Sequence, residues 1–198
     1  MNIVAFGDSI TAGRTGITPE QNWLLLLGQK LGEGFTLFNA GVGGNSAREA
    51  MARYDNDVLA HNPDMILLEF GGNNHDPYPE RRARRVSDDE FRALLQEFRR
   101  KLPKGCQVIM VTFPPIVNEH HVYYPHVPGG KVDEEIQPQR QIVRDFAAEN
   151  GWPLLDLYNL IWPRRDELIL PDGVHLNAAG NAFFAEKMYE LLKSVLKL

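Results

Sequence analysis

Four short polar segments contain residue types that together can carry out acyl transfer. They supply, in chain order, a serine, a glycine-rich turn, an asparagine and an Asp-x-x-His pair: Gly7–Thr11, Asn39–Ser46, Gly71–Asn74 and Asp172–His175. Acyl transfer needs a hydroxyl nucleophile, a base, a group that orients the base, and donors for the oxyanion of the tetrahedral intermediate. Each of these needs has a candidate here, so the segments predict a serine-dependent hydrolase.

The candidate nucleophile is Ser9, which follows Gly7-Asp8 on a turn ahead of a predicted helix start, with its own backbone N–H free to donate. The three-residue step from Asp172 to His175 is expected to place both side chains on one side of a helical turn. The carboxylate would then hold the imidazole while its other nitrogen faces Ser9. A glycine in Asn39–Ser46 allows close backbone approach, and Asn73 offers a neutral amide donor.

Each segment taken singly has a structural alternative. Gly, Asp and Ser all favour turns for local reasons, and Asn73 alone is typical of a loop-capping amide. Asp172 and His175 alone are typical of a helix cap and a surface histidine. The order of the four segments along the chain favours the catalytic interpretation.

The elements that must position these residues follow an α/β pattern. Short β-rich runs alternate with apolar residues spaced near 3.6, which predicts a parallel sheet covered by helices on both faces. We predict helices around Phe91–Leu102 and Ile136–Ala147, and a last helix from about Asn177. The five predicted strands are Asn2–Phe6, Phe35–Asn39, Asp64–Phe70, Gln107–Phe113 and Pro153–Leu157. In such a sheet, ligands bind at the carboxyl ends of the strands, where the four polar segments stand.

Composition limits the class of protein further. The 198 residues fit one domain, residues 1–198, and a net charge of -5 argues against binding nucleic acid. The single Cys106 excludes an internal disulfide. With no basic leader and no long apolar stretch, we expect neither a signal peptide nor a membrane span, and a cytoplasmic protein; a secreted form without its leader would look the same.

Two segments depart from the alternation and are expected to be loops that follow strands. Pro77–Arg85 carries Arg81, Arg82, Arg84 and Arg85, which favour a solvated surface, with contact to an anionic substrate or partner as the alternative. Pro114–Gly130 carries His120, His121 and His126, but no carboxylate or cysteine stands at ligand spacing. We therefore expect no metal and no cofactor.

The four segments resemble the signature blocks of the SGNH hydrolases, also called GDSL esterases and lipases, over nearly the whole chain. The resemblance implies that Ser9 is the nucleophile, that Asp172 and His175 are the catalytic pair, and that Ser9, Gly44 and Asn73 form the oxyanion hole. Gly43, one residue before Gly44, is the alternative position for the oxyanion glycine. It also implies a three-layer α/β/α fold with a five-stranded parallel sheet in the flavodoxin-like order 2-1-3-4-5.

One position departs from the family pattern, since the third block usually reads Gly-x-Asn-Asp and Asn74 stands in the last place. An asparagine keeps a carbonyl acceptor and loses the charge, so an Asn74→Asp exchange is expected to be close to neutral in kcat.

The expected substrate is a small-molecule ester, with a short acyl group on a polar alcohol such as a sugar acetate. A lysophospholipase or acyl thioesterase is the alternative within the class. A binding module without turnover is the alternative outside it, and a nucleotide site in Gly41–Ser46 is weaker still because no P-loop lysine follows. The sequence carries no signal for the oligomeric state.

Overall fold

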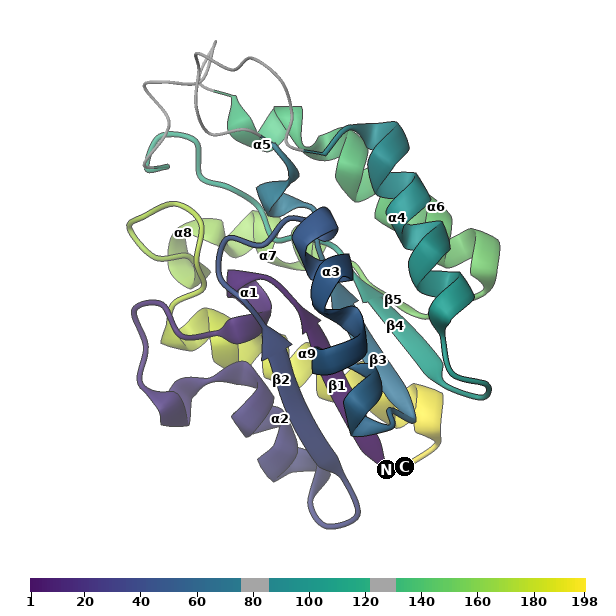
Figure 1. Ribbon diagram of the computed structural model, residues 1–198. Helices are drawn as coiled ribbons and strands as arrows, with labels where there is room; N and C mark the ends of the chain where they lie inside the picture. Colours follow the sequence, from purple (N-terminus) through teal and green to yellow (C-terminus); the bar gives the residue numbers. More distant parts are fainter. Residues whose placement is uncertain (76–85, 122–130) are drawn as a thin grey trace.

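The computed structural model describes residues 1–75, 86–121 and 131–198 and forms one parallel sheet between two layers of helices (Figure 1). The sheet has the order β2-β1-β3-β4-β5, which confirms the predicted topology. Its strands are β1 (Asn2–Gly7), β2 (Thr36–Gly41), β3 (Met65–Glu69), β4 (Gln107–Val111) and β5 (Leu154–Leu155).

Strand β5 is shorter than predicted. The sequence predicts a strand over Pro153–Leu157, but Asp156 accepts the backbone N–H of Asn159 and caps a helix that begins at Leu157. An apolar run with this composition fits either a strand or a buried helical turn, and the aspartate decides between them.

Helices cover both faces of the sheet (Figure 1). Helices α2 (Trp23–Leu31) and α9 (Ala178–Leu196) pack on one face; α3 (Ala47–Asp57), α4 (Asp88–Lys101) and α6 (Gln137–Asn150) cover the other. The three predicted helices are thus confirmed as α4, α6 and α9. Short helices lie near the carboxyl edge of the strands: α1 (Ser9–Ala12), α5 (Val132–Glu135), α7 (Leu157–Ile161) and α8 (Arg165–Leu168). Among the described residues, no helix combines the length and the apolar character needed to cross a lipid bilayer.

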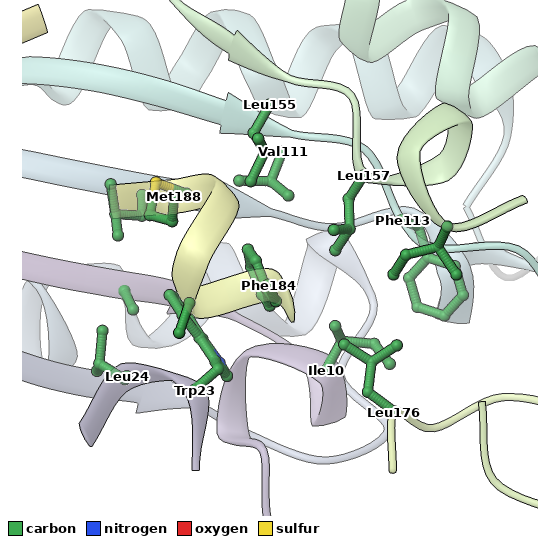
Figure 2. Close-up of a cluster of buried hydrophobic side chains, with 14 of the residues drawn as sticks. Ile10, Trp23, Leu24, Val111, Phe113, Leu155, Leu157, Leu176, Phe184 and Met188 are labelled. Carbon is green, nitrogen blue, oxygen red and sulfur yellow. The ribbon is translucent and has the colours of Figure 1, made fainter. Parts of the chain in front are cut away.

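The hydrophobic cluster on the α2 and α9 side reaches up to the carboxyl edge of the sheet (Figure 2). Trp23 stacks on Phe184 with ring centroids 4.1 Å apart, and its indole N–H donates to the carbonyl of Thr11 at 2.9 Å. Ile10 and Leu176 are both buried in this cluster, where Figure 2 shows them side by side. Ser9 and His175 are therefore each followed in the chain by an apolar residue that packs in the same core.

The parallel register of β1, β2 and β3 makes the three loops that follow them begin at the same level of the sheet. Gly7 at the end of β1 lies opposite Gly41 of β2 and Glu69 of β3. A Cβ on Gly7 would lie 1.9 Å from Thr11 Oγ1 and 2.7 Å from the carbonyl oxygen of Glu69. The chain leaves β1 through a turn so tight that only glycine fits beside α1.

We predict that Gly7→Ala lowers the free energy of unfolding by about 1–3 kcal/mol, the usual cost of overpacking a closed core. The matched control is Gly28→Ala in α2, where an added Cβ meets nothing nearer than a Leu37 methyl at 3.9 Å. That exchange should stabilise the protein by about 0.5–1 kcal/mol through helix propensity. Urea unfolding of both variants measures the difference, and equal effects would contradict the steric account.

Candidate active site

Ser9, His175 and Asp172 form a hydrogen-bonded chain at the carboxyl edge of the sheet. His175 Nε2 lies 2.9 Å from Ser9 Oγ, and His175 Nδ1 lies 2.7 Å from Asp172 Oδ2. All three side chains are partly accessible. Contact with the carboxylate favours the tautomer with a proton on Nδ1, which leaves Nε2 as the acceptor that faces the serine hydroxyl.

Asp172 and His175 meet through a turn closed by the aspartate, and the predicted helical turn is wrong. Asp172 Oδ1 accepts the backbone N–H groups of Val174 and His175 at 2.9 and 3.0 Å. Gly173 has φ +77°, outside the helical region, and a Cβ there would lie 2.6 Å from the carbonyl oxygen of Val117. One carboxylate thus shapes the turn with one oxygen and holds the imidazole with the other.

The same contacts set the charge state of Asp172. Partial burial acts to raise its pKa, but hydrogen bonds from the backbone of His175 and Val174 and from the imidazole outweigh burial and lower it. The carboxylate is therefore ionised at neutral pH and can stabilise an imidazolium as it forms.

Backbone hydrogen bonds hold this turn on both sides. The N–H of Leu170 donates to the carbonyl of His175 at 2.7 Å, and Ile169 pairs with Leu176 in an isolated antiparallel bridge. The N–H of Val117 donates to the carbonyl of Gly173 at 2.8 Å, so the segment after β4 packs over the turn.

Asn73 and the glycine loop lie beside Ser9. Asn73 Nδ2 donates to Asp8 Oδ2 at 2.9 Å and makes a longer contact of 3.4 Å with the carbonyl oxygen of Asn45. A Cβ on Gly43 would lie 3.8 Å from Ser9 Cβ, whereas Gly44 has φ +75° and a Cβ there would meet nothing within 4 Å. Gly43 therefore faces the serine, and the choice of Gly44 as the oxyanion donor stays a prediction.

Sequence reasoning missed Arg53, which links the loops of the site from α3. Its guanidinium donates to the carbonyl oxygen of Gly7 at 2.9 Å, to that of Ala40 at 2.7 Å and to Asn45 Oδ1 at 2.7 Å. These bonds join the ends of β1 and β2 to the glycine loop. Apart from an ion pair with Asp57 on the same helix, its partners come from the distant segments Gly7–Thr11 and Asn39–Ser46, so no local pattern marks these bonds.

Sequence reasoning also missed Glu69, although a carboxylate that ends an otherwise apolar, buried strand is a detectable signal. Glu69 and Asp8 are 2% and 0% exposed. Burial raises the pKa of Asp8 to about 6, and burial together with the charge of Asp8 raises that of Glu69 well above its usual value.

The histidines of the predicted loop separate into different environments. His121 is buried with its ring centroid 6.3 Å from that of His75, while His120 is exposed. Burial, and then the charge of His75, lower the pKa of His121 to about 4. Within residues 1–75, 86–121 and 131–198, no group of three or more His, Cys, Asp or Glu side chains is placed to hold a metal ion. His126 and the Arg81–Arg85 cluster lie outside the described residues.

Comparisons with known proteins place the chain in one family. The model of the GDSL-like lipase/acylhydrolase family matches residues 5–183. The chain is 27% identical to the isoamyl acetate-hydrolyzing esterase 1 homolog of Rattus norvegicus, over 96% of this chain and 80% of that protein.

Two solved structures share the fold. A lipase/acylhydrolase from Enterococcus faecalis superposes with a TM-score of 0.82 at 24% identity, over 98% of this chain and 96% of that one. The acetyl xylan esterase AlAXEase superposes with a TM-score of 0.78 at 28% identity, over 96% and 98%.

Asn74, the departure in the third block, is fully buried and bonded at both ends of its amide. Its Oδ1 accepts the N–H of Ala47, the first residue of α3, at 3.0 Å, and its Nδ2 donates to Gln139 Oε1 at 2.5 Å. The Gln139 amide cannot simply turn over, because its own Nε2 donates to the carbonyl oxygen of Val86 and to Asp88. The asparagine is thus paired with a glutamine on α6, which adds a cost in stability for Asn74→Asp; its expected neutrality in kcat stays a prediction.

We predict that Asn74→Asp lowers the free energy of unfolding at pH 7 by about 1–3 kcal/mol, because a carboxylate oxygen would face Gln139 Oε1 without a proton between them. Burial beside an acceptor raises the pKa of the new carboxyl, so its protonated form can donate and the loss should shrink as the pH falls. The control is Asn56→Asp on the exposed face of α3, where the new carboxylate stays in water and should change stability by no more than about 0.5 kcal/mol. Unfolding curves at two pH values check this; a pH-independent loss would contradict it.

Proposed function

The chain belongs to the GDSL-like lipase/acylhydrolase family and is an ester hydrolase, and on this premise we propose that Ser9, His175 and Asp172 hydrolyse short-chain carboxylic esters of a polar alcohol such as a sugar acetate. The observation that carries the proposal is the 2.9 Å contact between Ser9 Oγ and His175 Nε2, with Asp172 on the other ring nitrogen.

The reaction proceeds through an acyl-enzyme. Ser9 Oγ attacks the ester carbonyl as His175 takes the hydroxyl proton, and Asp172 stabilises the imidazolium. The backbone N–H groups of Ser9 and Gly44 and the amide of Asn73 donate to the oxyanion. His175 then protonates the leaving alcohol, and a water activated by the same histidine releases the acid.

The preference for a short acyl group draws support from two similarities. The chain is 28% identical to a solved acetyl xylan esterase over nearly its full length, and 27% identical to a protein named for the hydrolysis of an acetate ester. A lysophospholipase or acyl thioesterase would need to shelter a long chain. A non-catalytic binding module would have no use for a serine held at hydrogen-bond distance from a histidine.

We predict that kcat/KM falls by about tenfold or more from nitrophenyl acetate to nitrophenyl octanoate, the discrimination that a few mismatched methylenes produce. The same panel includes an acetylated xylo-oligosaccharide, a lysophospholipid and an acyl thioester. Highest kcat/KM on the acetates supports the proposal. Highest kcat/KM on the octanoate or lysophospholipid would replace it with the long-chain alternative.

We predict that Ser9→Ala lowers kcat on the order of 10⁴-fold or more, while the midpoint of thermal unfolding hardly changes, because the hydroxyl contributes chemistry and little packing. Ser194→Ala, an exposed serine near the end of α9, is the control and should keep full activity. A folded Ser9→Ala protein with more than about a tenth of wild-type kcat would overturn the assignment of the nucleophile.

We predict that kcat/KM rises with pH across the range of about 5 to 8 in which a histidine base loses its proton. Asp172 is ionised throughout this range because its pKa is lowered, so Asp172→Asn removes a charge that favours imidazolium. The midpoint of the acidic limb should therefore move to lower pH, and the plateau should fall on the order of 10⁴-fold.

Comparing the pH profiles of the wild type and Asp172→Asn isolates the contribution of the Asp172–His175 pair. Asp8, whose pKa burial raises to about 6, is present in both proteins, so its contribution to the limb is common to both. A midpoint in Asp172→Asn that is unchanged or higher would mean that Asp172 and His175 do not act together.

A further inference from the structure

Two carboxyl side chains lie buried beneath the proposed oxyanion site and take no part in the mechanism above. Asp8 is 0% exposed and Glu69 is 2% exposed. None of the ion pairs found within residues 1–75, 86–121 and 131–198 includes either carboxyl. Two buried carboxyls without a cation must lower their joint charge, and one proton between them does so.

The hydrogen bonds distinguish the two carboxyls. Asp8 Oδ1 accepts the N–H of Ile10 at 2.9 Å, and Asp8 Oδ2 accepts Asn73 Nδ2 at 2.9 Å. Glu69 Oε2 accepts the hydroxyl of Thr11 at 3.0 Å, whereas Glu69 Oε1 is buried and receives no donor. Both oxygens of Asp8 are thus supplied with donors, as an ionised carboxylate requires, and one oxygen of Glu69 is not.

The pKa shifts of the two carboxyls point to the same assignment as their hydrogen bonds. Burial raises both, and contact with Asp8 raises that of Glu69 further, while contact with Glu69 lowers that of Asp8. An imidazolium at His175 also favours the ionised form of Asp8. Glu69 is therefore the member that keeps the proton.

We propose that Glu69 Oε1 carries the proton that the two carboxyls share and donates it to Asp8, and that the ionised Asp8 fixes the side-chain amide of Asn73 for the oxyanion. The amide has two N–H groups. A charge-assisted bond to Asp8 holds one of them, and the other, which makes only the long 3.4 Å contact with the carbonyl oxygen of Asn45, can turn to the substrate. Asp8 and Glu69 are positioning residues that act through Asn73, so the proposal rests on the proposed function.

Two isosteric substitutions test the position of the proton. Glu69→Gln places an NH₂ where the protonated oxygen stands and keeps a carbonyl for Thr11, so kcat should stay within about threefold of wild type. Asp8→Asn sets an NH₂ against the donor of Asn73, so kcat should fall about 10² to 10³-fold, the size of one lost oxyanion donor, with KM little changed.

A double variant separates positioning from general damage. In an Asn73→Ala background, adding Asp8→Asn should lower kcat by no more than about threefold, because the amide that Asp8 positions is already gone. A full additional loss in that background, or a loss in Glu69→Gln equal to or larger than that in Asp8→Asn, would overturn the proposal.

Infrared spectroscopy tests the proton without turnover. At neutral pH the wild type should show the carbonyl stretch of a buried protonated carboxylic acid, which Glu69→Gln should lack. A band that persists in Glu69→Gln would place the proton elsewhere and overturn the proposal, even if Asp8→Asn fails to fold. If the proposed function is wrong, the wild type will hydrolyse no ester. The infrared result does not depend on turnover, so the two failures can be told apart.

Discussion

The parallel register of three strands is the constraint on which the site depends. Gly7 lies opposite Gly41 and Glu69, so the chain leaves β1, β2 and β3 at one level of the sheet. Parallel pairing with evenly spaced hydrogen bonds fixes this level, and helices on both faces prevent the strands from slipping. The serine turn, the glycine loop and the asparagine loop therefore start within reach of one another before any of their side chains interact.

The histidine reaches the site through packing, because its segment does not extend from a paired strand. Ile10 and Leu176 occupy one hydrophobic cluster, and the residues beside them are Ser9 and His175 (Figure 2). A close-packed core tolerates little displacement, so burial of these two side chains holds the nucleophile and the base at a fixed separation. The Asp172 carboxylate then sets the orientation of the imidazole.

Buried and partly buried polar groups below this edge hold the loops in one arrangement. Arg53 joins the glycine loop to two strand ends, Asn74 joins α3 to Gln139 on α6, and Asp8 holds Asn73. Such groups are expensive to bury unless every donor and acceptor is paired, and this requirement selects one geometry among many apolar packings. Preorganised donors are what a developing oxyanion needs, since they do not have to rearrange during the reaction.

The sequence by itself determined the α/β class with five parallel strands and the side chains that meet as Ser9, Asp172 and His175. Alternation of strand and helix patterns and polar residues at strand ends are local signals, readable from neighbours in the chain. Only the tertiary structure decided the non-helical Asp172 turn and the partners of Glu69 and Asn74. Gly173 bends that turn under contact with Val117, and the other partners stand 58 and 65 residues away in sequence. Long-range burial and hydrogen-bond pairing leave no periodic trace in a sequence, which is why they appear only when the chain is folded.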